Sequence, residues 1–267
     1  MTQDQNNQRS AASDRIAEAT RFHRDRVGPL AEPERVKFAV PAPKTVAQLA
    51  KEVADEESAK SREENERRAR QWHDVSSAMG ARYKSCKLSD FEFYGTPEDQ
   101  ARQKAAIESC FDLGRRIMAG ETERCGLVLY GPPGTGKDHI LAAMLYAACR
   151  GGRTVRWLNG LDFFGDMRDR MDNDSPESQI ISQLSNPDIL AISDPLPPWG
   201  PLTAFQAQTL FRVIDRRYRQ EKPIWVTVNV ADGAEASERI GAAVVDRLRQ
   251  RALSIHCNWP SYRSLGK

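Results

Sequence analysis

Short apolar runs alternate with helix-like stretches along the second half of the chain. Residues 126–130, 154–158, 189–192 and 224–228 have the length and composition of buried strands. Helical patterns follow at 140–149, 161–171, 205–219 and 242–251, and another helix is expected over 100–119. Such alternation is typical of a parallel sheet with helices on both faces. The pattern therefore predicts an α/β domain over residues 81–267.

The first 80 residues have a different pattern. Residues 1–44 are polar, charged and proline-containing, and we expect them to be disordered or loosely helical. A helix is expected to begin at Thr45, which forms a capping-box pattern with Gln48. An apolar stripe near Leu49 then gives way to mixed charge over 55–70. This segment is either a solvated helix or linker, or an arm that docks a partner protein. We predict a helical or disordered partner-binding extension over 1–80.

Composition narrows the class of protein. The net charge is only +2, so any contact with nucleic acid must come from a local patch. The five cysteines lack C-x-x-C spacing, which argues against a zinc cage or a disulfide framework and fits a reducing cytoplasm. The sequence shows no signal-peptide pattern and no apolar run of membrane length. These features predict a soluble, cytoplasmic protein with no membrane partner.

One motif carries the main chemical prediction. Residues 131–138 match the phosphate-binding loop G-x-x-x-x-G-K-[ST] at every position except the last, where an aspartate replaces the hydroxyl residue. A strand precedes the motif and a helix follows it, as phosphate binding requires. The loop therefore predicts binding of ATP. The expected nucleotide-binding residues are Gly131, Pro132, Pro133, Gly134, Thr135, Gly136, Lys137, Asp138 and His139.

A facing strand should end in an acidic residue near the magnesium ion, and the run 188–194 can be aligned in two ways. In one alignment Asp194 is the magnesium-side acid, and Pro195 replaces the glutamate that activates water. In the other, Ser193 takes the place of the acid and Asp194 takes the place of the glutamate.

We prefer the second alignment because it explains both anomalies together. The loop has exchanged a hydroxyl for a carboxylate at Asp138, and the strand has exchanged a carboxylate for a hydroxyl at Ser193. This exchange preserves the net charge beside Mg²⁺, whereas two facing carboxylates would repel each other. The predicted metal-site residues are Asp138, Ser193 and Asp194.

With these elements placed, residues 80–263 resemble the AAA+ helicase loaders of the DnaC type and the related IstB-type transposition ATPases. The resemblance rests on the phosphate loop, the strand end at Ser193-Asp194, and the segments 82–86, 222–229, 246–247 and 257–263. It implies an AAA+ fold of the P-loop NTPase class. Asp138, Ser193 and Pro195 depart from the family pattern, so hydrolysis of ATP is less certain than its binding.

The resemblance also implies roles for individual residues. Asn229 is similar to the sensor that orients the attacking water, and Asp194 to the acid beside that water. Arg247 resembles the arginine finger that reaches a neighbouring subunit's nucleotide, and Arg263 resembles the second sensor within the same subunit. Arginine suits these roles because its planar guanidinium matches phosphate geometry.

The helix around residues 163–171 lies between the two nucleotide motifs. In the resembled family this helix grips single-stranded DNA, which implies phosphate contacts by Arg168 and Arg170 and a base contact by Met171. The alternative is that its aromatic residues are core and its arginines only balance nearby aspartates. A second basic group is expected to form a solvated face or a subunit contact; it comprises Arg212, Arg216, Arg217 and Arg219.

The sequence supports three functional interpretations. The preferred one is an ATP-binding protein that forms a homo-oligomer and loads a replicative helicase onto single-stranded DNA. The second keeps the ATPase and replaces the helicase by a transposase. The third, based on Asp138 and Pro195, is an adaptor that binds nucleotide without hydrolysing it.

Overall fold

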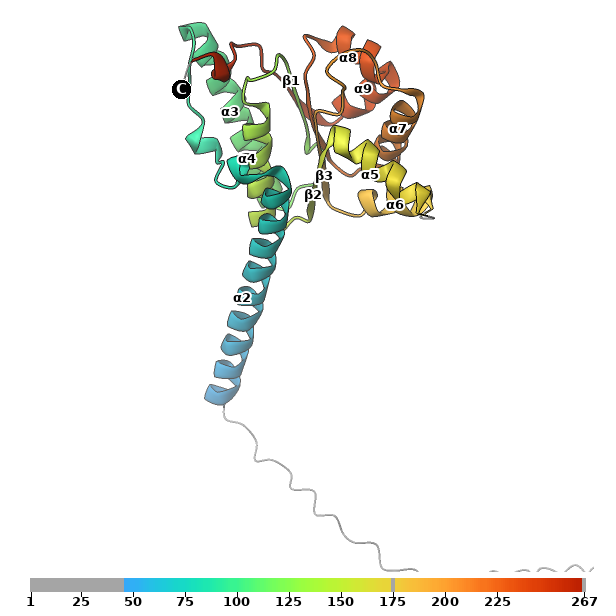
Figure 1. Ribbon diagram of the computed structural model, residues 1–267. Coiled ribbons are helices and arrows are strands. Elements are labelled where there is room, and N and C mark those ends of the chain that lie inside the picture. The colour runs from blue at the N-terminus through green and yellow to red at the C-terminus, as the bar shows by residue number, and fades with distance from the viewer. Residues whose placement is uncertain (1–45, 174–175, 266–267) are drawn as a thin grey trace, which may run out of the picture. The chain divides into compact units, whose positions relative to one another are not determined.

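The computed structural model describes residues 46–173 and 176–265 (Figure 1). The chain divides into two units, Met1–Glu52 and Val53–Lys267, and the second contains a five-stranded sheet. Its strands are all parallel and lie in the order β2-β3-β4-β1-β5. They are β1 (Gly126–Tyr130), β2 (Val155–Asn159), β3 (Ile189–Ser193), β4 (Ile224–Val228) and β5 (Ala252–His256). The predicted α/β fold class is confirmed.

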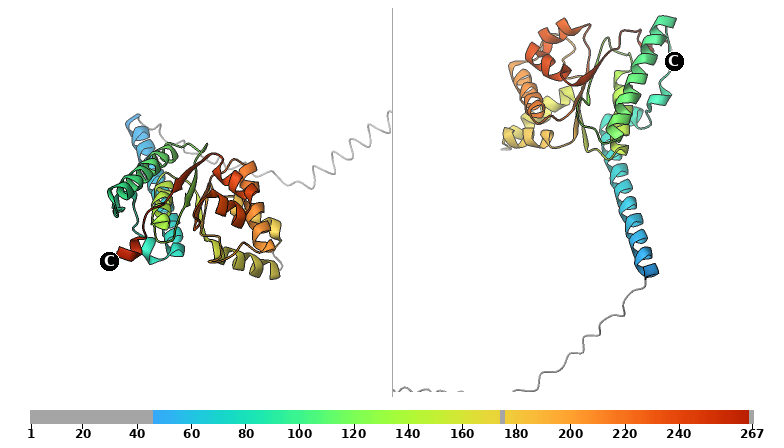
Figure 2. Two further views of the ribbon diagram at one scale, coloured as in Figure 1. Left: turned by 90° about the horizontal axis from the view of Figure 1, so that it is seen from above. Right: turned by 180° about the vertical axis from the view of Figure 1, so that it is seen from behind.

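Helices cover both faces of the sheet (Figure 2). One face carries α3 (Pro97–Met118) and α4 (Lys137–Arg150), and the other carries α5 (Gly160–Asp172), α6 (Glu177–Ser185), α7 (Ala204–Arg219), α8 (Gly233–Ile240) and α9 (Ala242–Arg249). Successive strand residues point to opposite faces, so Leu127 and Leu129 enter one core and Val128 enters the other. Burial on both sides explains why the strands read as continuous apolar runs.

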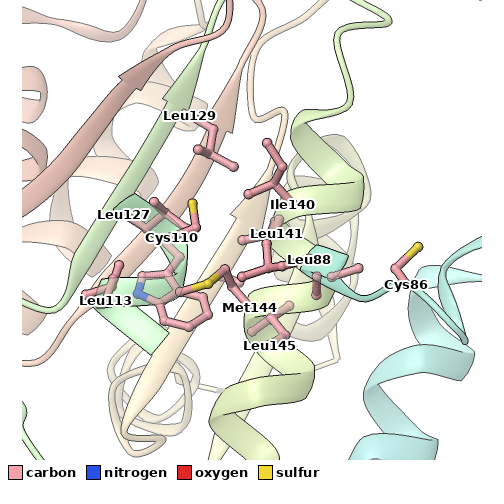
Figure 3. Packing of buried hydrophobic residues seen from close by; sticks show 14 of the residues in the cluster. Cys86, Leu88, Cys110, Leu113, Leu127, Leu129, Ile140, Leu141, Met144 and Leu145 are labelled. Carbon is pink, nitrogen blue, oxygen red and sulfur yellow. The ribbon is translucent and has the colours of Figure 1, made fainter. Parts of the chain in front are cut away.

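The core beneath α3 and α4 fixes the helix that follows the phosphate loop. Leu141 and Met144 of α4 are fully buried and lie between α3 and the side chains of β1 (Figure 3). Truncating a core leucine of this kind to alanine typically costs about 2–5 kcal/mol. The start of α4 is therefore held in place by packing along its length.

The helix α2 (Val46–Met79) begins in the first unit and continues into the second. Thr45, the predicted first residue of that helix, lies outside the described residues. Side chains over 53–67 are exposed, whereas Val75 and Met79 are buried in the same core as α4. Two short 3-10 helices, η1 (Ala81–Tyr83) and η2 (Leu88–Asp90), lead into α3. The proposed partner-binding role of residues 1–80 stays a prediction.

The sequence pattern missed α6, α8 and β5, and its prediction for Arg217 was wrong. Arg217 is fully buried, and its guanidinium donates to backbone carbonyls that include those of Asp188 and Pro223, each at 2.8 Å. Burial lowers its pKa to about 10. A buried charge is tolerated only with such hydrogen bonding, so Arg217 ties the chain together just before β3 and β4. Among the described residues, no helix is both long and apolar enough to cross a bilayer.

Candidate functional site: a nucleotide cavity at the carboxyl ends of the strands

The phosphate loop lies between β1 and α4, and its glycines pack against the segment that follows β5. Gly134 and Gly136 adopt left-handed conformations that glycine takes without strain. A Cβ atom on Gly131 would lie 2.5 Å from the carbonyl oxygen of Cys257, and one on Gly134 would lie 2.0 Å from Ser261 Oγ. The segment after β5 therefore packs so closely on the loop that these positions require glycine.

Two hydrogen bonds to backbone carbonyls of the loop connect the same segment to it. Trp259 Nε1 donates to the carbonyl oxygen of Thr135, and the Tyr262 amide donates to that of Gly134, both at 2.9 Å. Trp259 is buried. The sequence signalled this segment only through the family resemblance, because the contacts span more than 100 residues of chain. The segment fixes the loop's shape.

Lys137, the first residue of α4, is held inside the curve of the loop. Its Nζ donates to the carbonyl oxygens of Gly131 and Pro132, at 2.8 and 2.6 Å. Burial lowers the pKa of the lysine, while Asp138 and Asp194 act in the opposite direction. The ammonium group therefore lies beside the N-terminus of α4, where the helix dipole also favours a negatively charged ligand.

The two residues of the predicted exchange are in contact. Ser193 Oγ, at the end of β3, donates to Asp138 Oδ1 over 2.7 Å. Thr227 Oγ1 on the neighbouring strand β4 donates to the same oxygen over 3.0 Å. Parallel register places Ser193 opposite Thr227. Thr227 was not predicted from the sequence, although it lies near the end of β4 and two residues before Asn229.

Asp194 follows Ser193 in a left-handed conformation, with φ of 49°. Asn229 Nδ2 donates to its Oδ2 over 2.5 Å, and within the described residues its buried Oδ1 has no hydrogen-bond partner. Burial, followed by the nearby charge of Asp138, raises the pKa of Asp194. An unpaired carboxylate oxygen beside a second carboxylate suits a hard divalent cation, so the residues present fit Mg²⁺.

The raised pKa leads to a stability prediction for Asp194→Asn. A carboxyl group whose pKa rises on folding stabilises the folded state only while it is protonated, and ionisation removes that contribution as the pH increases through the folded-state pKa. The neutral amide should therefore raise the melting temperature at pH 7 by a few degrees. The gain should shrink towards zero near the ordinary pKa of 3.8, where both side chains are neutral. Thermal unfolding between pH 4 and 8 measures this, and a gain independent of pH would contradict it.

These side chains line a cavity of about 420 Å³. Such a volume is ordinary for a site that binds a small molecule. His139 Nε2 lies 3.0 Å from the carbonyl oxygen of Lys87, and its ring meets Phe91 edge to face. The cavity brings together most of the predicted site: Pro133, Gly134, Gly136, Lys137, Asp138, His139, Asp194, Asn229 and Arg263.

Arg247 lies outside this cavity, on α9. Its Nε donates to Asp215 Oδ1 over 3.2 Å, and its guanidinium lies over the rings of Phe211 and Tyr218, 5.0 and 5.5 Å from their centroids. The structure therefore does not bring Arg247 together with the other candidate catalytic residues of the same chain. The sequence-based prediction assigned Arg247 to the nucleotide site of a neighbouring copy, and that role stays a prediction.

The predicted DNA-binding arginines lie on the outer side of α5. Arg168 lies over the ring of Phe205 at 5.3 Å, and Arg170 donates to Gln183 Oε1 over 2.6 Å. Phe163, Phe164 and Met167 on the same helix are buried in the second core, as the alternative interpretation of this helix expected. Arg168 is exposed and Arg170 is half-buried.

Comparison with known proteins places this site in a family. The replicative helicase loader DnaC of Escherichia coli K12 is 30% identical over 141 residues, which cover 51% of this chain and 56% of DnaC. The chain thus spans about half the length of this curated relative. A putative ATP-binding protein in an insertion sequence of Mycobacterium tuberculosis is 28% identical over 183 residues, covering 66% of this chain and 67% of that protein.

Comparison with solved structures finds a helicase loader of the same kind. A crystal structure of the DnaC helicase loader superimposes with a TM-score of 0.56 at 20% sequence identity, over 66% of this chain and 98% of that one. At this identity the likeness concerns the fold. The model of the family described as IstB-like ATP binding protein matches residues 42–267. The chain therefore belongs to the family of IstB-like ATP-binding proteins.

Proposed function

We propose that the protein is an ATP-dependent switch that assembles head to tail and loads or remodels a replicative helicase on single-stranded DNA. The observation that carries this proposal is the convergence of Lys137, Asp138, Asp194, Asn229 and Arg263 on one cavity at the carboxyl ends of the strands. Open α/β sheets bind their ligands at this edge. The extension over 1–80 is proposed to dock the helicase.

Each residue of the cavity has a proposed task. Lys137 binds the outer phosphates, and Arg263 contacts them from the end of the chain. Asp138 and Asp194, with the hydroxyl of Ser193, would hold Mg²⁺, which would neutralise phosphate charge when bound. Asp194, which takes the place of the glutamate that activates water, is placed to accept a proton from the attacking water.

Two further residues complete the proposed reaction. Asn229 orients the attacking water and, through its bond to Asp194, keeps that carboxylate in position. Arg247 stabilises developing phosphate charge in the neighbouring copy. Hydrolysis therefore requires assembly, so turnover per chain should increase with protein concentration.

The contact with DNA leads to a prediction for Arg168→Ala. If Arg168 pairs with a phosphate, its loss should weaken single-strand binding about threefold to tenfold and reduce the slope of affinity against salt by about 0.7. Fluorescence anisotropy at several salt concentrations measures both quantities. Arg115→Ala, which removes an exposed arginine of α3, is the matched control. Unchanged affinity and slope in Arg168→Ala would remove this residue from the DNA site.

A second function is supported by the extent of the matches. The insertion-sequence relative is matched over a larger share of both chains than DnaC. The same nucleotide switch would then act on a transposase. Affinity capture with the full chain, including residues 1–80, separates the two. Recovery of a hexameric helicase supports loading, recovery of a transposase supports transposition, and recovery of neither in the presence of ATP and DNA contradicts both.

The third possibility is a nucleotide-binding adaptor without hydrolysis, and Pro195 after Asp194 is the feature that favours it. Phosphate release measured with DNA and client protein present decides this point. ATP binding without turnover under those conditions would support the adaptor and exclude the proton-accepting role of Asp194.

A further inference from the structure

A second cavity, of about 280 Å³, lies where β1, β4 and β5 begin. This is the opposite edge of the sheet from the nucleotide cavity. Its lining is rich in cations, which come from the turns before the strands and from α7 and α9. The basic residues that line it are Arg124, Arg219, Lys222, Arg247 and Arg251, and the acidic one is Glu221.

Three residues of this cavity have an unfavourable backbone conformation. Arg124, Glu221 and Arg251 have φ values of 53°, 56° and 61°. Glycine adopts this region without strain, whereas a residue with a side chain pays a cost there. The other non-glycine residue with positive φ in the described chain is Asp194, in the nucleotide cavity. Residues with such backbone strain cluster at functional sites, where the side chain has a function that glycine could not supply.

The charges of the second cavity are only partly paired. Arg251 donates to Glu221 Oε1 over 2.7 Å, and Arg219 and Arg247 share the carboxylate of Asp215, at 3.0 and 3.2 Å. The cations of this group still outnumber its carboxylates. A concave surface with such an excess attracts anions, and arginine matches phosphate groups in particular.

Lys222 lines the cavity, but its ammonium group is bound elsewhere. Its Nζ donates to the carbonyl oxygens of Ser185 and Asn186, at 2.8 and 2.7 Å, so its charge is directed to the chain before β3. Arg124 and Arg251 are both exposed and stand on turns at the cavity mouth. These two arginines are therefore the cations best placed to meet a ligand together with Arg247.

We propose that this cavity binds the phosphate groups of a nucleotide carried by a second copy of the chain, with Arg124 and Arg251 as recognition residues beside Arg247. The inference rests on the proposed head-to-tail assembly and extends it to two residues outside the nucleotide motifs. Charge complementarity supports a second copy as the occupant. The nucleotide cavity is lined by four carboxylates, Asp90, Glu92, Asp138 and Asp194, against the three cations Arg82, Lys137 and Arg263, so a bound nucleotide would make it strongly negative.

The strained turns allow a sharp test. The double variant Arg124→Gly with Arg251→Gly relieves backbone strain and removes two cations. It should keep or raise the melting temperature and leave the affinity of Mg-ATP for the chain's own cavity within about twofold, because the removed groups lie at the other edge of the sheet. ATP-dependent assembly, measured by sedimentation velocity, should weaken at least tenfold, as should turnover. Glu221→Gly is the matched control, because it relieves strain at the same mouth but removes a negative charge, and it should assemble at least as well as the unmodified chain.

The outcomes separate this inference from the function on which it rests. Normal assembly by the double glycine variant, while Arg247→Ala is impaired, would overturn the inference alone. Equal loss in Glu221→Gly would also overturn it, because charge would then not be the cause. Lost binding of single-stranded DNA with normal assembly would assign the cavity to nucleic-acid phosphates instead and overturn the second copy as occupant. Failure of the unmodified chain to assemble with ATP would overturn the proposed function.

Discussion

Lys137→Ala is expected to weaken binding of Mg-ATP by about 100-fold or more. Lys137 Nζ is fixed by two loop carbonyls and lies in the curve where the phosphates are proposed to bind. Hydrogen bonds to charged groups contribute about 1.5–3 kcal/mol each, and a lysine that contacts two phosphate oxygens would contribute about 3 kcal/mol in total. Since 1.4 kcal/mol corresponds to a factor of ten, the loss should reach two orders of magnitude. Isothermal titration of the full chain measures it.

The control for this experiment is Lys104→Ala, which removes an exposed lysine of α3. Its affinity for Mg-ATP should match that of the unmodified chain. Lys137→Ala leaves the buried carbonyl of Gly131 and the part-buried carbonyl of Pro132 without their donor, so the variant's thermal unfolding is measured beside its affinity. Binding within about threefold of normal in a folded Lys137→Ala variant would show that the phosphates do not lie in this loop.

Asp138→Thr is expected to weaken Mg-ATP binding about tenfold or more, although it restores the residue type of the standard motif. The carboxylate of Asp138 accepts hydrogen bonds from Ser193 and Thr227, at 2.7 and 3.0 Å. Threonine removes that acceptor and one of the two carboxylates proposed for Mg²⁺. Loss of one charged contact to the metal, worth about 1.5–3 kcal/mol, corresponds to a tenfold or larger loss of affinity. The deficit should depend on Mg²⁺ and shrink when titrations are repeated in excess chelator.

Ser193→Asp alone tests the other half of the same pair. It places a third carboxylate beside Asp138 and Asp194, and the pKa of Asp194 is already raised by burial and by Asp138. Mutual repulsion should destabilise the folded chain and raise its sensitivity to increasing pH, because the added carboxylate is charged at neutral pH. A variant as stable as the unmodified chain at pH 8 would show that the cluster does not hold its carboxylates in repulsive contact.

The sequence predicted the layout of the fold because both of its signals are local. Apolar runs such as Leu127–Leu129 identify buried strands, and the phosphate loop between strand and helix fixes one edge of the sheet as the ligand edge. The contact of Asp138 with Ser193 was also predictable, since the carboxyl ends of parallel strands meet at that edge. The structure was needed only for the distance and direction of the hydrogen bond between Ser193 and Asp138.

Other features depend on contacts between distant segments and leave little trace in sequence. Arg217 looked like one of several surface arginines, yet it is the one whose helical position turns it towards the carbonyls before β3 and β4. The cavity around Arg124 and Arg251 joins three turns that only the folded sheet brings together. The hydrogen bond from Trp259 to the phosphate loop likewise joins residues 124 positions apart.

The most direct test of the central claim is the affinity of Mg-ATP in the double variant Asp138→Thr with Ser193→Asp. If the two residues form an exchanged pair, the double variant restores one hydroxyl and one carboxylate beside the metal. Its affinity should return to within about threefold of the unmodified chain, with a coupling energy of about 1 kcal/mol or more in the double-mutant cycle. A double variant that binds Mg-ATP no better than Asp138→Thr alone would contradict the exchange.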